Sequence, residues 1–324
     1  MVFLLVSPNA LKAGAKYKDL YKRPTQIPYP ASNTYSDARM ILGRTLFFDP
    51  RLSGSNWISC ATCHNPAFSW GDGLAKGIGH GMKELNRRTP TILNLAWGEL
   101  MFWDGRTESL EEQALGPVAS TGEMNLPIDQ LLAKISKFEG YQVLFKGAYP
   151  EEGITKDTVS KAIATFERSV VSGKAPFDRW IEGDETAISE KAKHGFTLFN
   201  EKALCSQCHS GWRFTDEGFY DIGLVGDDKG RGKILPDIET LQYAFKTPTL
   251  RNVDHRAPYM HNGSEASLKK VVDFYNKGGD VSRGSKSEHI KALMLSDEEK
   301  NALIAFLKTL TSNDAATPVT MLPR

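Results

Sequence analysis

Cysteine is scarce in this chain, with four in 324 residues, and there is no run of 18 apolar residues. A chain of this size does not need a disulfide framework, and without a long apolar run we expect no membrane span. Neither sign of charge dominates, because 40 Lys and Arg residues stand against 39 Asp and Glu residues, for a net charge of +1. Bulk charge therefore gives no reason to expect nucleic-acid binding.

The four cysteines lie in two copies of one pattern, Cys-x-x-Cys-His. The copies are Cys60, Cys63 and His64, and Cys205, Cys208 and His209. In this attachment signature of a c-type haem, each thiol adds to a vinyl group of the porphyrin and the histidine binds the iron. We therefore predict two covalently bound haem c groups, with His64 and His209 as proximal ligands.

Other uses of the cysteines fit less well. A four-thiolate zinc site has its two cysteine pairs much closer in sequence, and it gives no reason for a histidine after each pair. A thioredoxin-like redox pair would lie near a βαβ unit, which the sequence does not show.

Since haem c is normally attached after export, we expect a periplasmic protein. Met1 to Val6 is apolar but shorter than the core of a signal peptide, and no basic residue precedes it. We interpret this start either as a trimmed remnant of a leader or as a numbering that begins after the leader.

Amphipathic helical patterns recur in the two halves of the chain. They cover 36–47 and 158–171 in the first half, and 187–200 and 296–310 in the second. Gly43–Phe47 and Gly195–Phe199 have similar sequences, and each precedes a haem motif. Ser296 and Glu299 form a capping box. Because helix, haem motif, long insert and closing helix occur twice in this order, we predict a mainly α fold with two cytochrome-c-like domains.

The predicted domains are 1–172, with an irregular lead-in over 7–36 and the first haem, and 173–324, with the second haem. The boundary is expected in the stretch Ser172–Pro176, where glycine and proline interrupt the helical pattern.

Further segments surround the two haem motifs in a fixed order. They are Leu42–Pro50, Ile78–Gly81, Phe102–Arg106, Glu111–Pro117, Gly122–Met124, Thr247–Asn252 and Ala257–Gly263. In this order they resemble the bacterial di-haem cytochrome c peroxidase and MauG family, over a stretch from Asp37 to Leu310. The resemblance implies an oxidoreductase that uses hydrogen peroxide at the first, peroxidatic haem and exchanges electrons through the second.

The same resemblance implies roles for residues around the first haem. Glu123 matches the carboxylate that moves a proton between the two peroxide oxygens. Gln113 matches a hydrogen-bonding residue of the distal pocket. His80, sixteen residues after His64, matches a histidine that binds the resting iron in many members and leaves before peroxide enters. The MauG branch lacks this arrangement, so both states of His80 stay open.

Around the second haem, the sixth iron ligand separates the two branches. The position where peroxidases have methionine falls on Tyr275, and MauG has tyrosine there. Met260 and Met294 are the competing thioethers. Methionine raises the reduction potential of a haem, whereas tyrosinate stabilises the oxidised iron. We favour Tyr275.

Other residues match positions that bind or connect the haems. Trp103 matches an indole between the two haems, and Arg106 and Arg251 are candidate partners of haem propionates. Relatives hold Ca²⁺ with an asparagine side chain and two backbone carbonyl groups, here those of Arg256 and Pro258. The asparagine position is Arg88 in this sequence, with Asn86 two residues away, so the calcium site stays open.

Three functions follow from this sequence. The first is a MauG-like enzyme with a tyrosine-ligated second haem, which oxidises a protein partner. The second is a cytochrome c peroxidase, which reduces peroxide to water with electrons from a small cytochrome c or cupredoxin. The third is a di-haem electron carrier without catalysis. The resemblance also leaves room for a homodimer.

Overall fold

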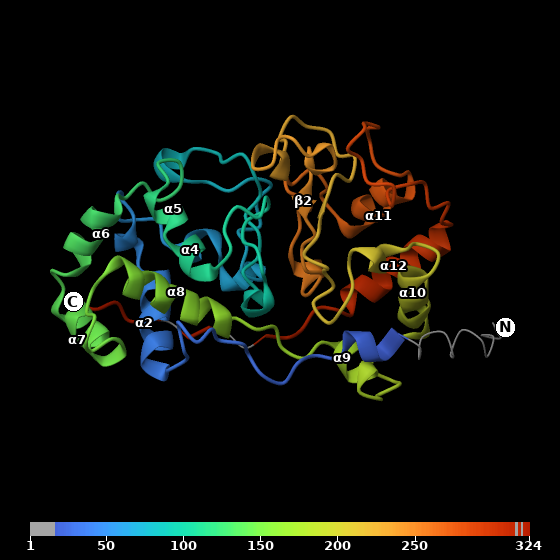
Figure 1. The fold of residues 1–324 in the computed structure, drawn as a ribbon. Helices are drawn as coiled ribbons and strands as arrows, with labels where there is room; N and C mark the ends of the chain where they lie inside the picture. Colours follow the sequence, from blue (N-terminus) through green and yellow to red (C-terminus); the bar gives the residue numbers. More distant parts are fainter. Residues whose placement is uncertain (1–16, 315–316, 319) are drawn as a thin grey trace. The chain divides into compact units, whose positions relative to one another are not determined.

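A computed structural model describes residues 17–314, 317–318 and 320–324, and over this part the chain is mainly helical (Figure 1). The α-helices are α2 (Asp37–Phe48), α3 (Cys60–Cys63), α4 (Leu110–Ala114), α5 (Gly116–Ala119), α6 (Ile128–Ile135), α7 (Glu139–Ala148), α8 (Lys156–Ser169), α9 (Pro176–Ile181), α10 (Glu190–Asn200), α11 (Leu268–Asn276) and α12 (Asp297–Lys308). The 3₁₀ helices are η1 (Lys18–Tyr21), η2 (Pro50–Leu52), η3 (Pro66–Phe68), η4 (His80–Met82), η5 (Leu95–Trp97), η6 (Cys205–Gln207), η7 (Arg231–Lys233), η8 (Glu239–Leu241) and η9 (Val253–His255). The strands β1 (Phe219–Tyr220) and β2 (Phe245–Lys246) form one antiparallel pair.

The predicted mainly α class is therefore confirmed. None of the helices in the described ranges is long and apolar enough to cross a membrane. The predicted leader remnant, Met1 to Val6, lies outside the described residues, as does the first part of the lead-in.

The chain divides into two compact units. The N-terminal unit contains Thr25–Val171, Met260–Ser264 and the described residues after Asp314. The C-terminal unit contains residues 17–24, Ser172–Tyr259 and Glu265–Asp314. Each unit has its own hydrophobic core.

The end of the lead-in differs from the sequence prediction, which placed it with the first domain. Tyr21 in η1 is 1% exposed in the core of the C-terminal unit. Its ring stacks on Phe214 with centroids 4.8 Å apart, and its hydroxyl donates to Oδ1 of Asn200 at 2.9 Å. Burial of this aromatic ring explains why residues 17–24 belong to the C-terminal unit.

Each unit is built on one close pair of helices, α2 with α8 and α10 with α12. A Cβ on Gly43 would lie 1.8 Å from the carbonyl oxygen of Ala162, and a Cβ on Gly195 would lie 2.0 Å from that of Ala302. Only glycine permits such an approach of two helix backbones. The same contact occurs at corresponding places in both units, as an internal duplication predicts.

The helix starts follow their capping residues. The side chains of Ser36, Thr155, Ser189 and Ser296 cap α2, α8, α10 and α12. Glu299 completes the predicted capping box, because the backbone N–H of Ser296 donates to its Oε2 at 2.8 Å. The predicted start of α10, at residue 187, was three residues early because the cap is Ser189.

Candidate haem-binding sites

Both Cys-x-x-Cys-His motifs fold into a single helical turn. In the first, the backbone N–H of His64 donates to the carbonyl of Cys60 at 2.8 Å. In the second, His209 donates to Cys205 at the same distance. The first cysteine and the histidine thus close one turn, which brings both thiols and the imidazole together as the sequence pattern requires.

The imidazole of each motif histidine is oriented by a hydrogen bond from its Nδ1 to a backbone carbonyl group. Nδ1 of His64 lies 3.2 Å from the carbonyl oxygen of Trp70, and Nδ1 of His209 lies 2.9 Å from that of Phe214. A carbonyl oxygen only accepts, so each Nδ1 carries the proton and each Nε2 offers its lone pair. Burial also lowers the pKa of both imidazoles, which keeps them neutral.

A repeated pair of threonines supports these carbonyl groups, and the sequence analysis did not identify it. The hydroxyl of Thr91 donates to the carbonyl of Ser69 at 2.7 Å, and that of Thr249 donates to the carbonyl of Arg213 at 2.6 Å. In each unit this carbonyl directly precedes the one that accepts from the imidazole. Both threonines end a Thr-Pro-Thr sequence, so a direct comparison of the two halves would have found them.

The four thiols differ from those of redox-active cysteines. Burial raises the pKa of Cys63 and Cys205 to about 12 and that of Cys208 to about 11, and it raises the pKa of Cys60 as well. Redox-active cysteines have lowered pKa values instead. Within the described ranges, no group of three or more His, Cys, Asp or Glu residues is arranged to hold a metal ion. The zinc alternative therefore has no support in this structure.

Glu123 lies beside the first haem motif. Burial raises the pKa of its carboxyl group, and the positive charge of Arg106 partly opposes that shift. The charge of Glu123 in turn contributes to the raised pKa of Cys63. A raised pKa brings this carboxyl group closer to the proton exchange that acid–base catalysis requires.

His80 reaches the same region on a neighbouring loop. Its backbone N–H donates to the carbonyl of Gly122 at 3.0 Å, and a Cβ on Gly79 would lie 1.9 Å from that oxygen. The Nδ1 atom of His80 is buried and has no hydrogen-bond partner among the described residues. A buried ring nitrogen without a partner fits a group that binds there. Gly81, with φ +67°, gives the loop a backbone conformation that other residues rarely adopt.

Three more residues assigned by resemblance lie in the N-terminal unit. Gln113 is half-buried in α4. Trp103 is 8% exposed, and its Nε1–H donates to the carbonyl of Arg88 at 2.8 Å. Nη1 of Arg106 binds the buried Asp104 at 2.9 Å, so this guanidinium already has a carboxylate partner within the chain.

In the C-terminal unit, Tyr275 on α11 lies near the second motif. Burial raises the pKa of its phenol, and the charges of Cys205 and Cys208 add to that shift. Its hydroxyl makes no hydrogen bond to another described residue, so the oxygen is free to bind a metal ion. The competing thioether of Met294 fits less well, because this side chain is 79% exposed.

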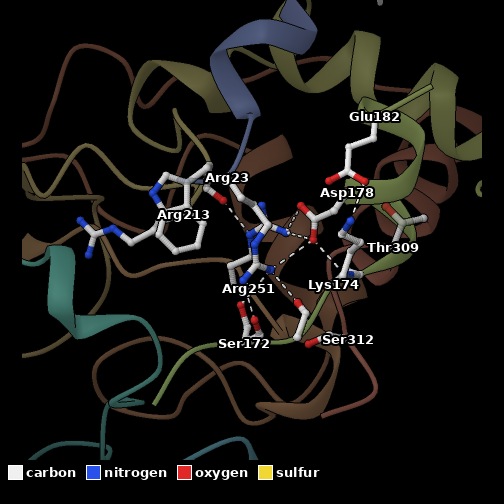
Figure 2. A network of polar contacts seen from close by, with 12 residues as sticks. Arg23, Ser172, Lys174, Asp178, Glu182, Arg213, Arg251, Thr309 and Ser312 are labelled. Carbon is white, nitrogen blue, oxygen red and sulfur yellow. Dashed lines mark hydrogen bonds and ion pairs between the residues drawn. The ribbon is translucent and has the colours of Figure 1, made fainter. Parts of the chain in front are cut away.

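Arg251 lies at the centre of the polar network in Figure 2. It is fully buried; Nη1 binds Oδ2 of Asp178 at 2.9 Å, and Nε donates to the carbonyl of Trp212 at 2.6 Å. Burial lowers its pKa to about 10, which still leaves the guanidinium charged. Nη2 is buried and has no partner among the described residues, which fits an anionic group such as a haem propionate.

Asp178 is shared with a second arginine, Arg23, from the lead-in. Nη1 of Arg23 lies 3.3 Å from Oδ2 of Asp178 and also donates to the carbonyl of Gly173 at 2.6 Å. Two guanidinium groups thus surround one carboxylate, leaving surplus positive charge for an anionic ligand.

The residues considered for calcium lie in different units. Arg88 and Asn86 belong to the N-terminal unit, and Arg256 and Pro258 belong to the C-terminal unit. Arg88 is 6% exposed, and a buried cation opposes the binding of Ca²⁺. The calcium site stays a prediction.

Two mainly helical units that each present a haem-attachment turn define the class of di-haem c-type cytochromes. The family model described as di-haem cytochrome c peroxidase matches residues 37–186. The methylamine utilization protein MauG of Methylorubrum extorquens is 49% identical over 95% of this chain and 88% of its own length. MauG of Methylophilus methylotrophus is 44% identical over 99% of this chain and 96% of its own.

Among solved structures, a MauG-like protein associated with microbial copper homeostasis is similar. It is 30% identical, with a TM-score of 0.83 over 90% of this chain and 95% of the other. The chain therefore belongs to the di-haem cytochrome c peroxidase family. It is a MauG-like oxidoreductase of that family, whose cofactors are haems.

Proposed function

We propose that this enzyme uses hydrogen peroxide at its first haem to oxidise a protein partner through its second. The observation that carries the first part is the half-buried carboxyl group of Glu123, whose charge acts on the thiol of Cys63 and whose pKa is raised by burial. An acid–base group for peroxide must lose and regain a proton in one cycle, and its pKa must therefore lie near the working pH.

A c-type haem, when bound, supplies the iron that peroxide approaches and the electrons that break its O–O bond. The remaining tasks belong to the chain. The neutral imidazole of His64 offers Nε2 to the iron, while its Nδ1 stays on the carbonyl of Trp70. Glu123 takes the proton from the near peroxide oxygen and returns it to the far one, so that water leaves. Gln113 supplies a hydrogen bond in the same pocket.

Tyr275 supports the MauG-like version over the peroxidase version. A phenol with a raised pKa would lose its proton to solvent only when a strong Lewis acid, such as ferric iron, binds its oxygen. Tyrosinate then favours the oxidised state of that iron. A second haem of this kind stores oxidising equivalents, which suits oxidation of a partner protein more than steady electron uptake from a small cytochrome c or cupredoxin.

The finer assignments are part of this proposal. We assign covalent attachment to Cys60 and Cys63 in the first site and to Cys205 and Cys208 in the second. Trp103 connects the haems, Arg251 binds a propionate, and His80 is the switchable ligand. Attachment of haem c after export gives a periplasmic location. Ca²⁺ and a homodimer remain predictions from the family resemblance, to be tested by metal analysis and by light scattering.

The proposal is tested by replacing Glu123 with glutamine, which keeps the size of the side chain and removes its acid–base chemistry. We expect the rate of the absorbance change that follows mixing with peroxide to fall about a hundredfold or more. Glu112→Gln, in the exposed first turn of α4, is the matched control and should react at the normal rate.

Both haems should stay attached in the Glu123 variant, as shown by the Soret band of the denatured protein. Normal peroxide reactivity in this variant would exclude the assigned role. A wild-type protein that ignores peroxide in every redox state would leave only the electron-carrier function.

A further inference from the structure

A tyrosine beside the second haem motif has no part in the chemistry described above. Tyr220 lies in β1, half-buried, and its hydroxyl donates to Oδ2 of Asp216 at 2.7 Å. Asp216 is exposed, and its backbone N–H donates to the carbonyl of Cys208 at 2.8 Å. The Tyr220–Asp216 pair is therefore attached to the turn that carries a haem thiol, and it reaches the surface of the unit.

The phenol of Tyr220 and the thiol of Cys208 affect each other's pKa. Burial raises the pKa of Cys208 to about 11, the charge of Asp216 adds to that shift, and hydrogen bonding with Tyr220 opposes it. Burial also raises the pKa of Tyr220, followed by its hydrogen bond to Asp216 and the charge of Cys208. Together with the bond from Asp216 to the carbonyl of Cys208, this places the phenol close to the cysteine that the motif offers to the porphyrin.

Gly218 allows the two side chains to meet. A Cβ at this position would lie 2.8 Å from the hydroxyl oxygen of Tyr220 and 2.9 Å from Oδ2 of Asp216. The backbone N–H of Gly218 also donates to Oδ1 of Asp216 at 2.9 Å. The carboxylate is therefore fixed with one oxygen on the backbone and the other on the phenol.

We propose that Tyr220 is the electron relay between the second haem and the protein partner, with Asp216 as its proton acceptor. This inference rests on the proposed function. It adds the residue through which electrons pass from the partner to the second haem. A phenol is oxidised at neutral pH when its proton has a base to go to, and Oδ2 of Asp216 is that base.

Each step transfers one electron and one proton. One electron leaves Tyr220 toward the second haem site, and the O–H proton moves to Asp216, which leaves a neutral phenoxyl radical and a neutral carboxyl group. One electron from the partner then reduces the radical, and the same proton returns to the phenol oxygen. Hydrogen peroxide is the terminal oxidant, so two such cycles use its two oxidising equivalents.

The alternative is that the Tyr220–Asp216 hydrogen bond only fixes the loop. Three variants separate these roles. Tyr220→Phe removes both the proton and the redox group, whereas Asp216→Asn keeps a hydrogen-bond acceptor but removes the base. Tyr35→Phe is the matched control, because Tyr35 makes the same kind of bond to Asp37, at 2.6 Å, in the N-terminal unit.

The measurements are freeze-quench electron paramagnetic resonance after one equivalent of peroxide and the rate at which a reduced c-type cytochrome, used as the probe donor, is oxidised. We expect Tyr220→Phe to lose the tyrosyl radical signal and to lower the donor rate about tenfold or more, since positioned proton transfer accounts for effects of at least that size. Asp216→Asn should lower both, and Tyr35→Phe neither.

The peroxide absorbance change must stay normal in all three variants, which keeps this test separate from that of Glu123. If it is normal and Tyr220→Phe retains both the radical signal and the donor rate, the relay is wrong while the proposed function stands. If Asp216→Asn behaves like wild type and only Tyr220→Phe is slow, Asp216 is not the proton acceptor.

Discussion

Glu167 shows how burial can dominate the protonation state of a side chain. It lies in α8, is 4% exposed, and its Oε2 has no partner among the described residues. Arg168, the adjacent cation, already makes a two-bond pair with Glu111 at 2.6 and 2.9 Å. Burial raises the pKa of Glu167 to about 8; the charge of Arg168 opposes this shift and that of Glu111 adds to it. The carboxyl group is therefore mostly neutral at pH 7.

This pKa predicts a pH dependence of stability that glutamine at position 167 should remove. The pKa rises from 4.5 in the unfolded chain to about 8 in the folded one, so the folded state binds more protons between these values. Stability from this group is fully present below pH 4.5 and is lost as pH rises through 8. Glu167→Gln should therefore stabilise the fold at pH 7 by roughly 3 kcal/mol, from 1.36 kcal/mol per pKa unit.

Urea unfolding of the apo-protein at pH 5 and pH 8 measures this effect. Glu151→Gln, at an exposed position of the same unit, is the control and should leave the pH profile unchanged. An unchanged profile in the Glu167 variant would mean that the carboxyl group is ionised or solvated in the folded state.

At the scale of elements, the two helix crossings depend on glycine. The Cβ of an alanine at position 195 would lie 2.0 Å from the carbonyl oxygen of Ala302 and 2.8 Å from Cβ of Phe306. The overlap is with backbone and with Cβ of Phe306, whose side chain is fully buried in the core, so α10 and α12 must move apart. We expect Gly195→Ala to destabilise the C-terminal unit by about 1–3 kcal/mol and to reduce retention of the second haem.

Gly147→Ala is the matched control for this change. Gly147 also lies inside a helix, α7, but a Cβ there meets nothing within 4 Å. Alanine should stabilise that helix by about 0.5–1 kcal/mol, because glycine is a poor helix former. Equal effects of the two substitutions, by thermal unfolding and by haem content, would show that helix propensity and not the crossing determines the outcome at Gly195.

Some features of these elements could be predicted from the sequence and others could not. The haem motifs, the capping box at Ser296 and the position of Tyr275 on its helix depend on local spacing, which the sequence contains directly. The orphaned Nη2 of Arg251 and the neutral Glu167 depend on contacts between segments more than 50 residues apart or on the depth of burial, which no local pattern encodes.

For the whole molecule, the two units share one plan but differ in what stands near each haem. The N-terminal unit has Glu123 and a loop histidine near its motif, whereas the C-terminal unit has the phenol of Tyr275. In the proposed function, one site handles protons and the other holds an oxidised iron. This division suits an enzyme that reacts with peroxide in one unit and oxidises its partner from the other.

Tyr275→Met tests this division. Methionine raises the potential of a haem, so the second site should become a better electron acceptor. We expect the midpoint potential of that haem to rise, its spectrum to gain methionine character, and oxidation of a reduced c-type cytochrome to speed up relative to oxidation of a partner protein. Met294→Leu, at the exposed thioether, should change none of these. An unaltered spectrum and potential in Tyr275→Met would show that another group is the sixth ligand, and the peroxidase function would then be favoured over the MauG-like one.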